Sequence, residues 1–96
     1  MTELEGHYQH AGVHVKWNEK RVKVLRGEES TRVKWRHVSG VRRIGSLPGH
    51  VQLIVRDHVP PGDAGQDPFS IPVASEADAN RLLTLFAWLA ASREAS

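Results

Sequence analysis

The chain has 96 residues, a formal net charge of +2 and no cysteine. A chain of this length forms one domain with one modest core, and without cysteine it has no disulfide, thiolate metal site or thiol chemistry. No apolar run approaches the ~20 residues of a transmembrane segment, and the N-terminus lacks the basic-then-apolar pattern of a signal peptide. The sequence therefore predicts a soluble, cytoplasmic protein.

The charges are unevenly distributed along the chain. Residues 1–56 carry eleven Lys and Arg against five acidic residues, whereas residues 57–96 carry two against six. All six histidines lie at or before His58, so acidification would increase the contrast. If the basic half faces one direction, its field favours acidic partners.

Alternation of apolar and polar residues predicts strands from residue 12 onward. The polar and acidic segment 1–6 is expected to be frayed, and the first strand spans 12–17. A tight hairpin connection leads to the second strand at 21–26, and a third strand follows at 31–36. The inward positions of these strands are Val13, Val15, Trp17, Val22, Val24, Val33 and Trp35.

The alternation then slips, which predicts a bend before a fourth strand at about 40–44. A fifth strand follows at 50–57, and 58–68 is predicted to be a mobile loop because it is rich in Pro, Gly and Asp. The sixth strand, 69–73, contains Pro72. Proline lacks the N–H that a central strand needs, so this strand is expected to lie at a sheet edge or to end there.

The segment from Ser75 to Arg93 is the only one with a sustained helical period. Ser75 is a suitable N-cap, and Glu76 and Asp78 suit the positive end of the helix dipole. At about 100° per residue the apolar side chains fall on one arc. The residues of this arc, which we expect to be buried against the strands, are Ala79, Leu82, Leu83, Phe86, Leu89 and Ala90.

The predicted fold class is α+β and mainly β: an antiparallel β-meander or barrel of about six to seven strands, closed by one C-terminal amphipathic helix. This order of elements resembles the pleckstrin-homology-like (PH-like) fold, and more narrowly the small PH-like domains of bacterial proteins. The resembling segments are 12–17 with its turn into 21–24, then 38–41, 50–55 and 69–89. The resemblance implies one PH-like domain over residues 1–96. The predicted chain departs from the full PH plan in two ways. It has six strands where the plan has seven, and its first hairpin turn is very short.

The resemblance also invites a comparison with phosphoinositide-binding PH domains, which carry a Lys at the end of the first strand and Lys/Arg-x-Arg on the second. Lys16, Arg21 and Lys23 occupy comparable places in this sequence. The connection Asn18-Glu19-Lys20 is too short to form the phosphate cradle of those domains, and Glu19 would place a negative charge in its mouth. Headgroup binding of that specific kind is disfavoured, since a shared fold does not imply a shared function.

The outward positions of the first three predicted strands are basic. Period-two alternation places six permanent cations on one side, together with His14: Lys16, Arg21, Lys23, Arg32, Lys34 and Arg36. One interpretation is a solvated strand face whose charges discourage edge pairing. The other is a binding site for an acidic protein segment, an anionic lipid or a nucleic acid. Nucleic acid is the weaker case. Single-strand binders stack bases on exposed aromatic residues, whereas Trp17 and Trp35 occupy inward positions in the strand alternation.

No catalytic, cofactor or metal motif stands out. His7, His10 and His14 are close in sequence, but an extended strand would place His7 on the opposite face from the other two, and neither a cysteine nor a carboxylate pair completes a site. The chain has no nucleophile elbow, phosphate loop or dinucleotide fingerprint. The adjacent pair Asp57 and His58 is too common to indicate catalysis. We therefore expect no enzyme and no cofactor.

Trp88 lies almost opposite the buried arc of the predicted helix, with Leu85 at the edge of that outer face. Its indole either folds onto a loop such as 60–68 or acts as an interface anchor, in a homodimer or against another partner.

The sequence as a whole predicts a non-enzymatic binding module of PH-like type, with a protein or peptide as the favoured partner. The alternatives are a peripheral binder of anionic lipid or nucleic acid, and a structural homo-oligomer that uses the helix.

Overall fold

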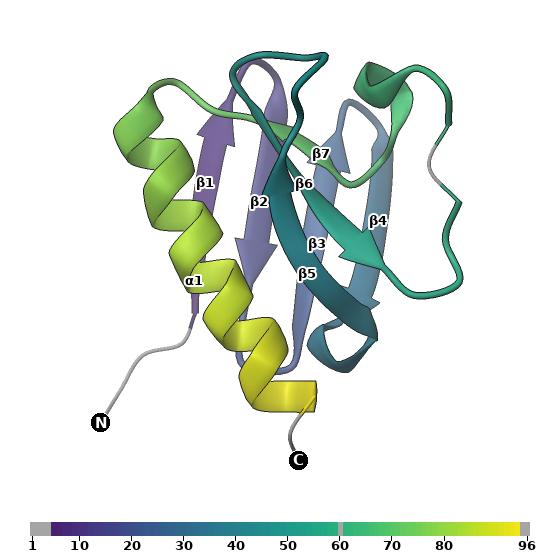
Figure 1. The fold of residues 1–96 in the computed structure, drawn as a ribbon, viewed down its shortest axis with the longest axis vertical. Helices are drawn as coiled ribbons and strands as arrows, with labels where there is room; N and C mark the ends of the chain where they lie inside the picture. The colour runs from purple at the N-terminus through teal and green to yellow at the C-terminus, as the bar shows by residue number, and fades with distance from the viewer. Residues whose placement is uncertain (1–4, 60, 95–96) are drawn as a thin grey trace.

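The computed structural model describes residues 5–59 and 61–94, which form two antiparallel sheets and one long helix (Figure 1). Sheet A contains, in spatial order, β1 (Gly6–His10), β2 (Val13–Trp17), β3 (Arg21–Arg26) and β4 (Glu29–Lys34). Sheet B contains β5 (Val38–Arg43), β6 (His50–Val55) and β7 (Ser70–Pro72). The remaining elements are the helix α1 (Glu76–Glu94) and two short 3-10 turns, η1 (Trp35–His37) and η2 (Ala64–Gln66).

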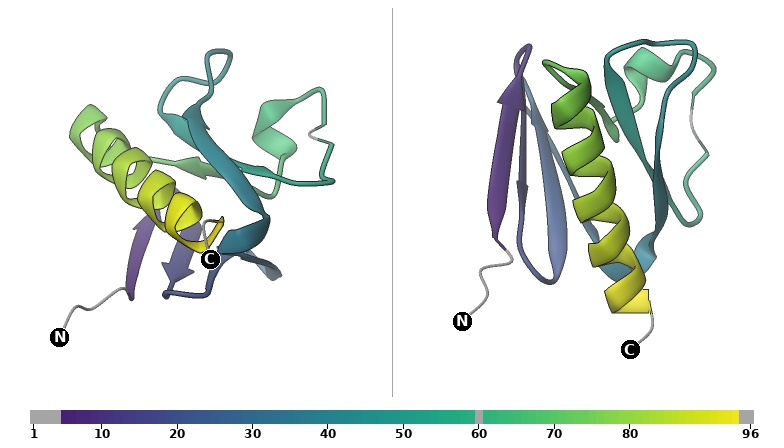
Figure 2. Two further views of the ribbon diagram at one scale, coloured as in Figure 1. Left: turned by 60° about the horizontal axis from the view of Figure 1, so that its bottom comes forward. Right: turned by 60° about the vertical axis from the view of Figure 1, so that its left-hand side comes forward.

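The two sheets face each other, and α1 lies along the opening between them (Figure 2). Within the described residues, β4 is not paired with β5, so the predicted barrel is not closed and the strands form two separate sheets. β7 is an edge strand that ends at Pro72, as the proline predicted. No helix in the described ranges is long and apolar enough to cross a lipid bilayer.

The core fills the space between the sheets and under the helix. The predicted arc of α1 supplies Leu82, Phe86 and Leu89, none of which is exposed. The Phe86 ring lies 5.1 Å from the Trp17 ring and 5.4 Å from the Trp35 ring, centroid to centroid, and so joins α1 to sheet A and to η1. Such aromatic contacts stabilise a small core beyond the area they bury.

The start of α1 is fixed by hydrogen bonds from two sheets. Ser75 is the N-cap, because its Oγ accepts a hydrogen bond from the Asp78 amide at 3.2 Å. The Tyr8 hydroxyl in β1 donates to Asp78 Oδ2 at 2.8 Å and accepts from the Ala74 amide at 2.8 Å. From β5, the guanidinium of Arg43 donates to the side chains of Glu76 and Asn80, which are exposed acceptors on the first turns of α1. Its ion pair with Glu76 also suits the helix dipole.

The structure corrects several predicted boundaries. The sequence missed β1 altogether and treated residues up to Gly6 as frayed, although Gly6 is the first residue of this strand; residues 1–4 lie outside the described part of the chain. The third predicted strand was extended too far: it ends at Lys34, because Trp35 begins η1. The Trp35 indole donates to the Asn18 carbonyl at 2.8 Å, and this contact turns the chain toward the core.

The second half of the chain differs in smaller ways. The fourth strand begins at Val38 with a bulge before Gly40, and the fifth ends at Val55, two residues early, because Asp57 has a φ of +63°. The segment 58–68 was predicted to lack regular structure, but its described part contains η2 and, near its end, a fully buried aspartate, Asp67.

Candidate binding surface on the outer face of sheet A

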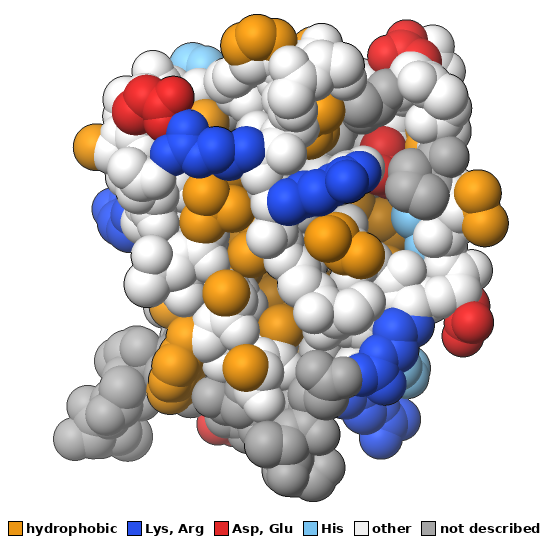
Figure 3. Space-filling model, in the orientation of Figure 1, with side chains coloured by type: hydrophobic (Ala, Val, Ile, Leu, Met, Phe, Trp, Pro, Cys, Tyr) orange, Lys and Arg blue, Asp and Glu red, His pale blue; other side chains and the backbone are white. Residues whose placement is uncertain are grey.

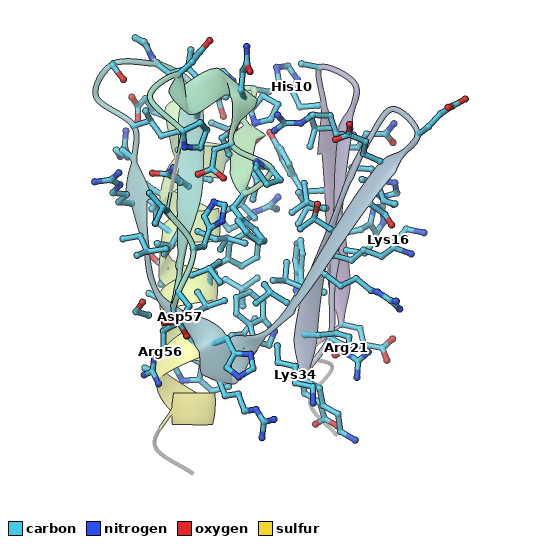
Figure 4. All side chains as sticks on the ribbon, turned by 90° about the vertical axis from the view of Figure 1, so that its right-hand side faces the viewer. His10, Lys16, Arg21, Lys34, Arg56 and Asp57 are labelled. Carbon is cyan, nitrogen blue, oxygen red and sulfur yellow. The ribbon has the colours of Figure 1, made fainter. Side chains whose placement is uncertain are left out.

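One row of basic side chains crosses all four strands of sheet A. In the strand register His7 lies opposite Lys16, Lys16 opposite Lys23, and Lys23 opposite Arg32. Neighbouring strands are about 4.8 Å apart, so this basic row is roughly 14 Å long. Figure 4 shows Lys16 directed away from the space between the two sheets, where the core side chains lie. The basic row is therefore on the outer face of the sheet.

The other predicted basic residues divide into two groups. Arg21 and Lys34 are exposed and lie opposite each other in the next outward position, beside the basic row (Figure 4). Arg36 does not belong to the strand face, because it lies in η1 after the end of β4. Five of the six predicted cations thus share the outer face of sheet A.

The basic row borders an open depression of about 780 Å³. Its lining includes Lys16, Lys23 and Arg32 of the row, the neighbouring Arg21, and one acidic residue, Glu5. Like charges placed directly opposite each other destabilise a sheet. Within the described residues, no ion pair neutralises Lys16, Lys23 or Arg32: the ion pairs found there join Arg43 to Glu76 and His58 to Asp67. The depression is therefore a strongly cationic surface.

Two histidines meet at one end of the basic row. His7 Nδ1 and His14 Nε2 are 3.3 Å apart and share a hydrogen bond, and the rings meet edge to face with centroids 5.3 Å apart. The prediction that His7 and His14 lie on opposite faces is wrong, because the chain reverses between them. Ala11 and Gly12 have φ values of +52° and +82°, as in a two-residue hairpin turn, and they fold β1 back onto β2.

The surroundings of His14 favour its neutral form. The pKa of His14 is lowered, first by desolvation, then by the charge of Lys16 and by His7. In the register, His14 lies between Gln9 and Leu25, neither of which carries a compensating negative charge. Sequence reasoning missed this pair because it had no strand before residue 12.

The existence of β1 also changes the comparison with phosphoinositide-binding PH domains. Lys16 lies on the second strand, and Arg21 and Lys23 lie on the third. The first hairpin turn is Ala11–Gly12 and carries no cation. The residues compared with the headgroup motif therefore lie on the second and third strands, whereas the motif lies on the first and second.

A second polar cluster lies on the other side of the molecule, where the segment after β6 returns to β7. The Asp67 carboxylate is fully buried. It accepts hydrogen bonds from the Gln52 side chain, from the Phe69 amide at 3.1 Å, and from His58 Nε2, which is 3.0 Å away. The sequence singled out Asp57 beside His58, but the structural partner of His58 is Asp67. These contacts anchor the end of the loop, together with the Ser70 hydroxyl, which donates to the Asp67 carbonyl at 2.9 Å.

The outer face of α1 carries Trp88, which is 51% exposed, whereas Leu85 is half-buried and packs against the core. In Figure 1 the helix α1 lies on the left of the molecule and the described part of the β6–β7 loop on the right, so that part of the loop does not cover the helix. From the helix side, hydrophobic side chains form small separate groups (Figure 3). Among the described residues, Trp88 is the one exposed large aromatic side chain.

In the described part of the chain, no group of three or more His, Cys, Asp or Glu side chains is arranged to hold a metal ion. No family model, curated protein or solved structure matches this chain.

Proposed function

We propose that this chain is a PH-like domain that acts as a non-enzymatic binding module for an acidic segment of a protein partner. The observation that carries the proposal is the direct alignment of Lys16, Lys23 and Arg32 on three adjacent strands, with no ion pair to any of them among the described residues. Such an arrangement costs stability in the free protein. An acidic ligand would remove that cost and add charge-assisted hydrogen bonds.

The element order supports the PH-like part of the proposal. Four strands, then three strands, then one C-terminal helix follow each other along the chain, and the seven strands supply the number that the PH plan requires. The resemblance gives the fold only, since function depends on the site built on it.

Two features favour a protein segment over the other acidic ligands. A single-stranded nucleic acid would stack its bases on exposed aromatic residues. Trp17 lines the depression but is half-buried and packs against Phe86, and Tyr8 bonds to the start of α1. A membrane surface is usually held by basic residues together with an apolar anchor. Among the described residues, the large exposed apolar side chains are those of Ile54, Val59 and Trp88, which lie on or after β6 and on α1, away from the basic row.

Fluorescence anisotropy with a labelled peptide of alternating Glu and Ser tests this function. We expect the wild type to bind the peptide, and the affinity to fall steeply with salt. The triple variant Lys16→Gln/Lys23→Gln/Arg32→Gln should bind at least tenfold more weakly, which corresponds to about 0.5 kcal/mol or more for each lost charge pair.

The matched control removes three cations from other places: Lys20→Gln/Arg36→Gln/Arg81→Gln. It should bind within about twofold of the wild type, because loss of long-range charge alone is screened at physiological salt. Equal losses in both triple variants would show that net charge, not the basic row, holds the peptide. Tighter binding of an oligothymidylate or of phosphatidylserine vesicles would replace the protein segment with that ligand.

A homo-oligomer is the second candidate function, and the exposure of Trp88 favours it. Tryptophan is enriched among the residues that dominate interface energies. This candidate uses α1 rather than sheet A, so the two functions are independent of each other.

A further inference from the structure

The contact between His7 and His14 depends on their protonation. A hydrogen bond between two imidazole nitrogens needs one donor and one acceptor, so at least one of the two rings must be neutral. If both rings were protonated, the two nitrogens 3.3 Å apart would both be donors and would repel each other. An anion placed beside them could accept from both.

Cationic groups lie close to the pair in the free protein. Lys16 lies directly opposite His7 on β2, Lys23 follows on β3, and Arg32 follows on β4. Leu25 lies opposite His14, and it contributes no polar group. Glu5 also lines the depression and is the one acidic residue among the described residues of that lining. The lowered pKa of His14, caused first by desolvation and then by Lys16 and His7, agrees with this arrangement.

We propose that the His7–His14 pair is the anion-binding centre at one end of the basic row, and that it takes an acidic side chain of the partner with uptake of a proton. This inference rests on the proposed function. The incoming carboxylate accepts hydrogen bonds from the imidazoles and lies next to Lys16, so it offsets the repulsion that a protonated pair would meet from Lys16 and within itself. The cations of the basic row then bind further acidic residues of the same segment.

The sign of the pH dependence follows from this exchange. The bound anion raises the histidine pKa values, so the bound state holds more protons than the free state and affinity increases as pH falls. Free histidine titrates near 6.5 and glutamate near 4.3. Affinity should therefore rise between about pH 8 and pH 5.5, and it should fall again where the peptide carboxylates become protonated.

Isothermal titration calorimetry with the unlabelled Glu-Ser peptide tests the inference. We expect the wild type to bind about three- to tenfold more tightly at pH 5.5 than at pH 8, as a few exposed ion pairs allow. At pH 6.5, buffers of different ionisation enthalpy should report net proton uptake on binding. His7→Gln/His14→Gln should reduce the pH effect to less than about twofold and abolish the proton uptake.

His10→Gln is the matched control. His10 is an exposed histidine of the same strand as His7, but it pairs with Val13 on the opposite face from the basic row. This variant should keep the wild-type pH dependence. Circular dichroism should show that all variants are folded, since the substituted side chains lie on the surface.

Failure of the histidine pair can be distinguished from failure of the proposed function. Peptide binding with a pH-independent dissociation constant would overturn the role of the histidine pair and leave the proposed function in place. A full pH effect in His7→Gln/His14→Gln would overturn that role in the same way. Absence of peptide binding at every pH would overturn both the proposed function and this inference.

Discussion

Lys16 and Lys23 lie directly opposite each other in the β2–β3 ladder, and Arg32 continues the row on the far side of Lys23. Lys23 is half-buried between two other cations. Directly opposed like charges destabilise a sheet, so these positions are not optimised for stability. Stability and binding should therefore respond in opposite directions to a substitution in the centre of the row.

Lys23→Glu should stabilise the fold and weaken binding. The new carboxylate would lie between Lys16 and Arg32, so two repulsive cross-strand pairs become attractive and the free energy of unfolding should rise by about 0.5–2 kcal/mol. The gain should shrink in high salt. Urea unfolding followed by tryptophan fluorescence measures the change in the free energy of unfolding. The control is Lys20→Glu in the β2–β3 turn, which makes the same charge change outside the basic row. A stability loss in Lys23→Glu would contradict the argument.

Tyr8→Phe should destabilise the protein although the ring is kept. The lost hydroxyl donates to Asp78 and accepts from the Ala74 amide, so we expect a decrease of about 1–2 kcal/mol in the free energy of unfolding. Burial is the main cause that raises the Tyr8 pKa. The unfolded chain therefore loses the tyrosine proton first, and stability should fall as pH rises above about 10.

Denaturation at pH 7 and at alkaline pH tests both parts. The Tyr8→Phe variant should lack the alkaline loss that is due to this group, so the difference between the two proteins should shrink as pH rises. A constant difference across the pH range would show that the hydroxyl does not need its proton to hold the start of α1.

Asp67→Asn should be much more harmful than Asp57→Asn. One oxygen of Asp67 accepts from Gln52, and the other accepts from the Phe69 amide and faces His58. An amide nitrogen in either place would meet a donor, so we expect a loss of about 1–3 kcal/mol. Gln52 is not free to turn, because its Oε1 accepts from Arg42 Nε at 2.9 Å.

Asp57 is exposed, and asparagine tolerates its positive φ, so Asp57→Asn should change stability by less than about 0.5 kcal/mol. Thermal unfolding of the two variants compares the aspartates directly. Equal losses would mean that the buried cluster does not anchor the loop.

Trp88→Ala should leave the fold intact and change self-association. The side chain is 51% exposed on α1, so its removal opens no core cavity. If α1 forms an interface, loss of an aromatic anchor there should weaken it by about 2 kcal/mol or more. Light scattering after size exclusion measures the mass, and Thr84→Ala, exposed one turn earlier on the same helix, is the control. A monomeric mass for the wild type and the variant would exclude the homo-oligomer.

The parts of the fold that the sequence predicted are those held by short-range patterns. The buried arc of α1 and its Ser75 cap follow from spacings of three and four residues. The cap is confirmed, and five of the six arc residues are buried, whereas Leu83 is partly buried. The Asn18–Lys20 connection is also local, since Asn18 Oδ1 accepts from the amides of Lys20 and Arg21. Such features need no knowledge of the tertiary structure.

The parts that the sequence missed depend on distant contacts. β1 has no apolar alternation, and its inward Tyr8 is fixed by Asp78, 70 residues away. Without β1, neither the His7–His14 contact nor the fourth position of the basic row could be predicted. Trp35 fits the apolar–polar alternation of the preceding strand, but it lies in η1, after the end of β4. Its indole donates to the Asn18 carbonyl. Asp67 similarly acquires its role only through Gln52 and His58.

Gly6→Ala should disturb the edge of sheet A that carries His7. A Cβ at Gly6 would lie 2.5 Å from Cζ2 of the Trp17 indole, so the ring or the first residue of β1 must move. Trp17 also contacts Phe86 of α1, with ring centroids 5.1 Å apart, so the displacement would reach the core. We expect a loss of about 1–3 kcal/mol, as for overpacked sites.

Gly45→Ala is the control, because a Cβ there meets nothing within 4 Å and the residue has no positive φ. It should change the free energy of unfolding by less than about 0.5 kcal/mol. Urea unfolding and tryptophan fluorescence compare the two variants. If Gly6→Ala were as stable as the control, with unchanged tryptophan emission, then β1 would not be packed on the Trp17 ring. The position of His7 beside His14 would then lose its structural support.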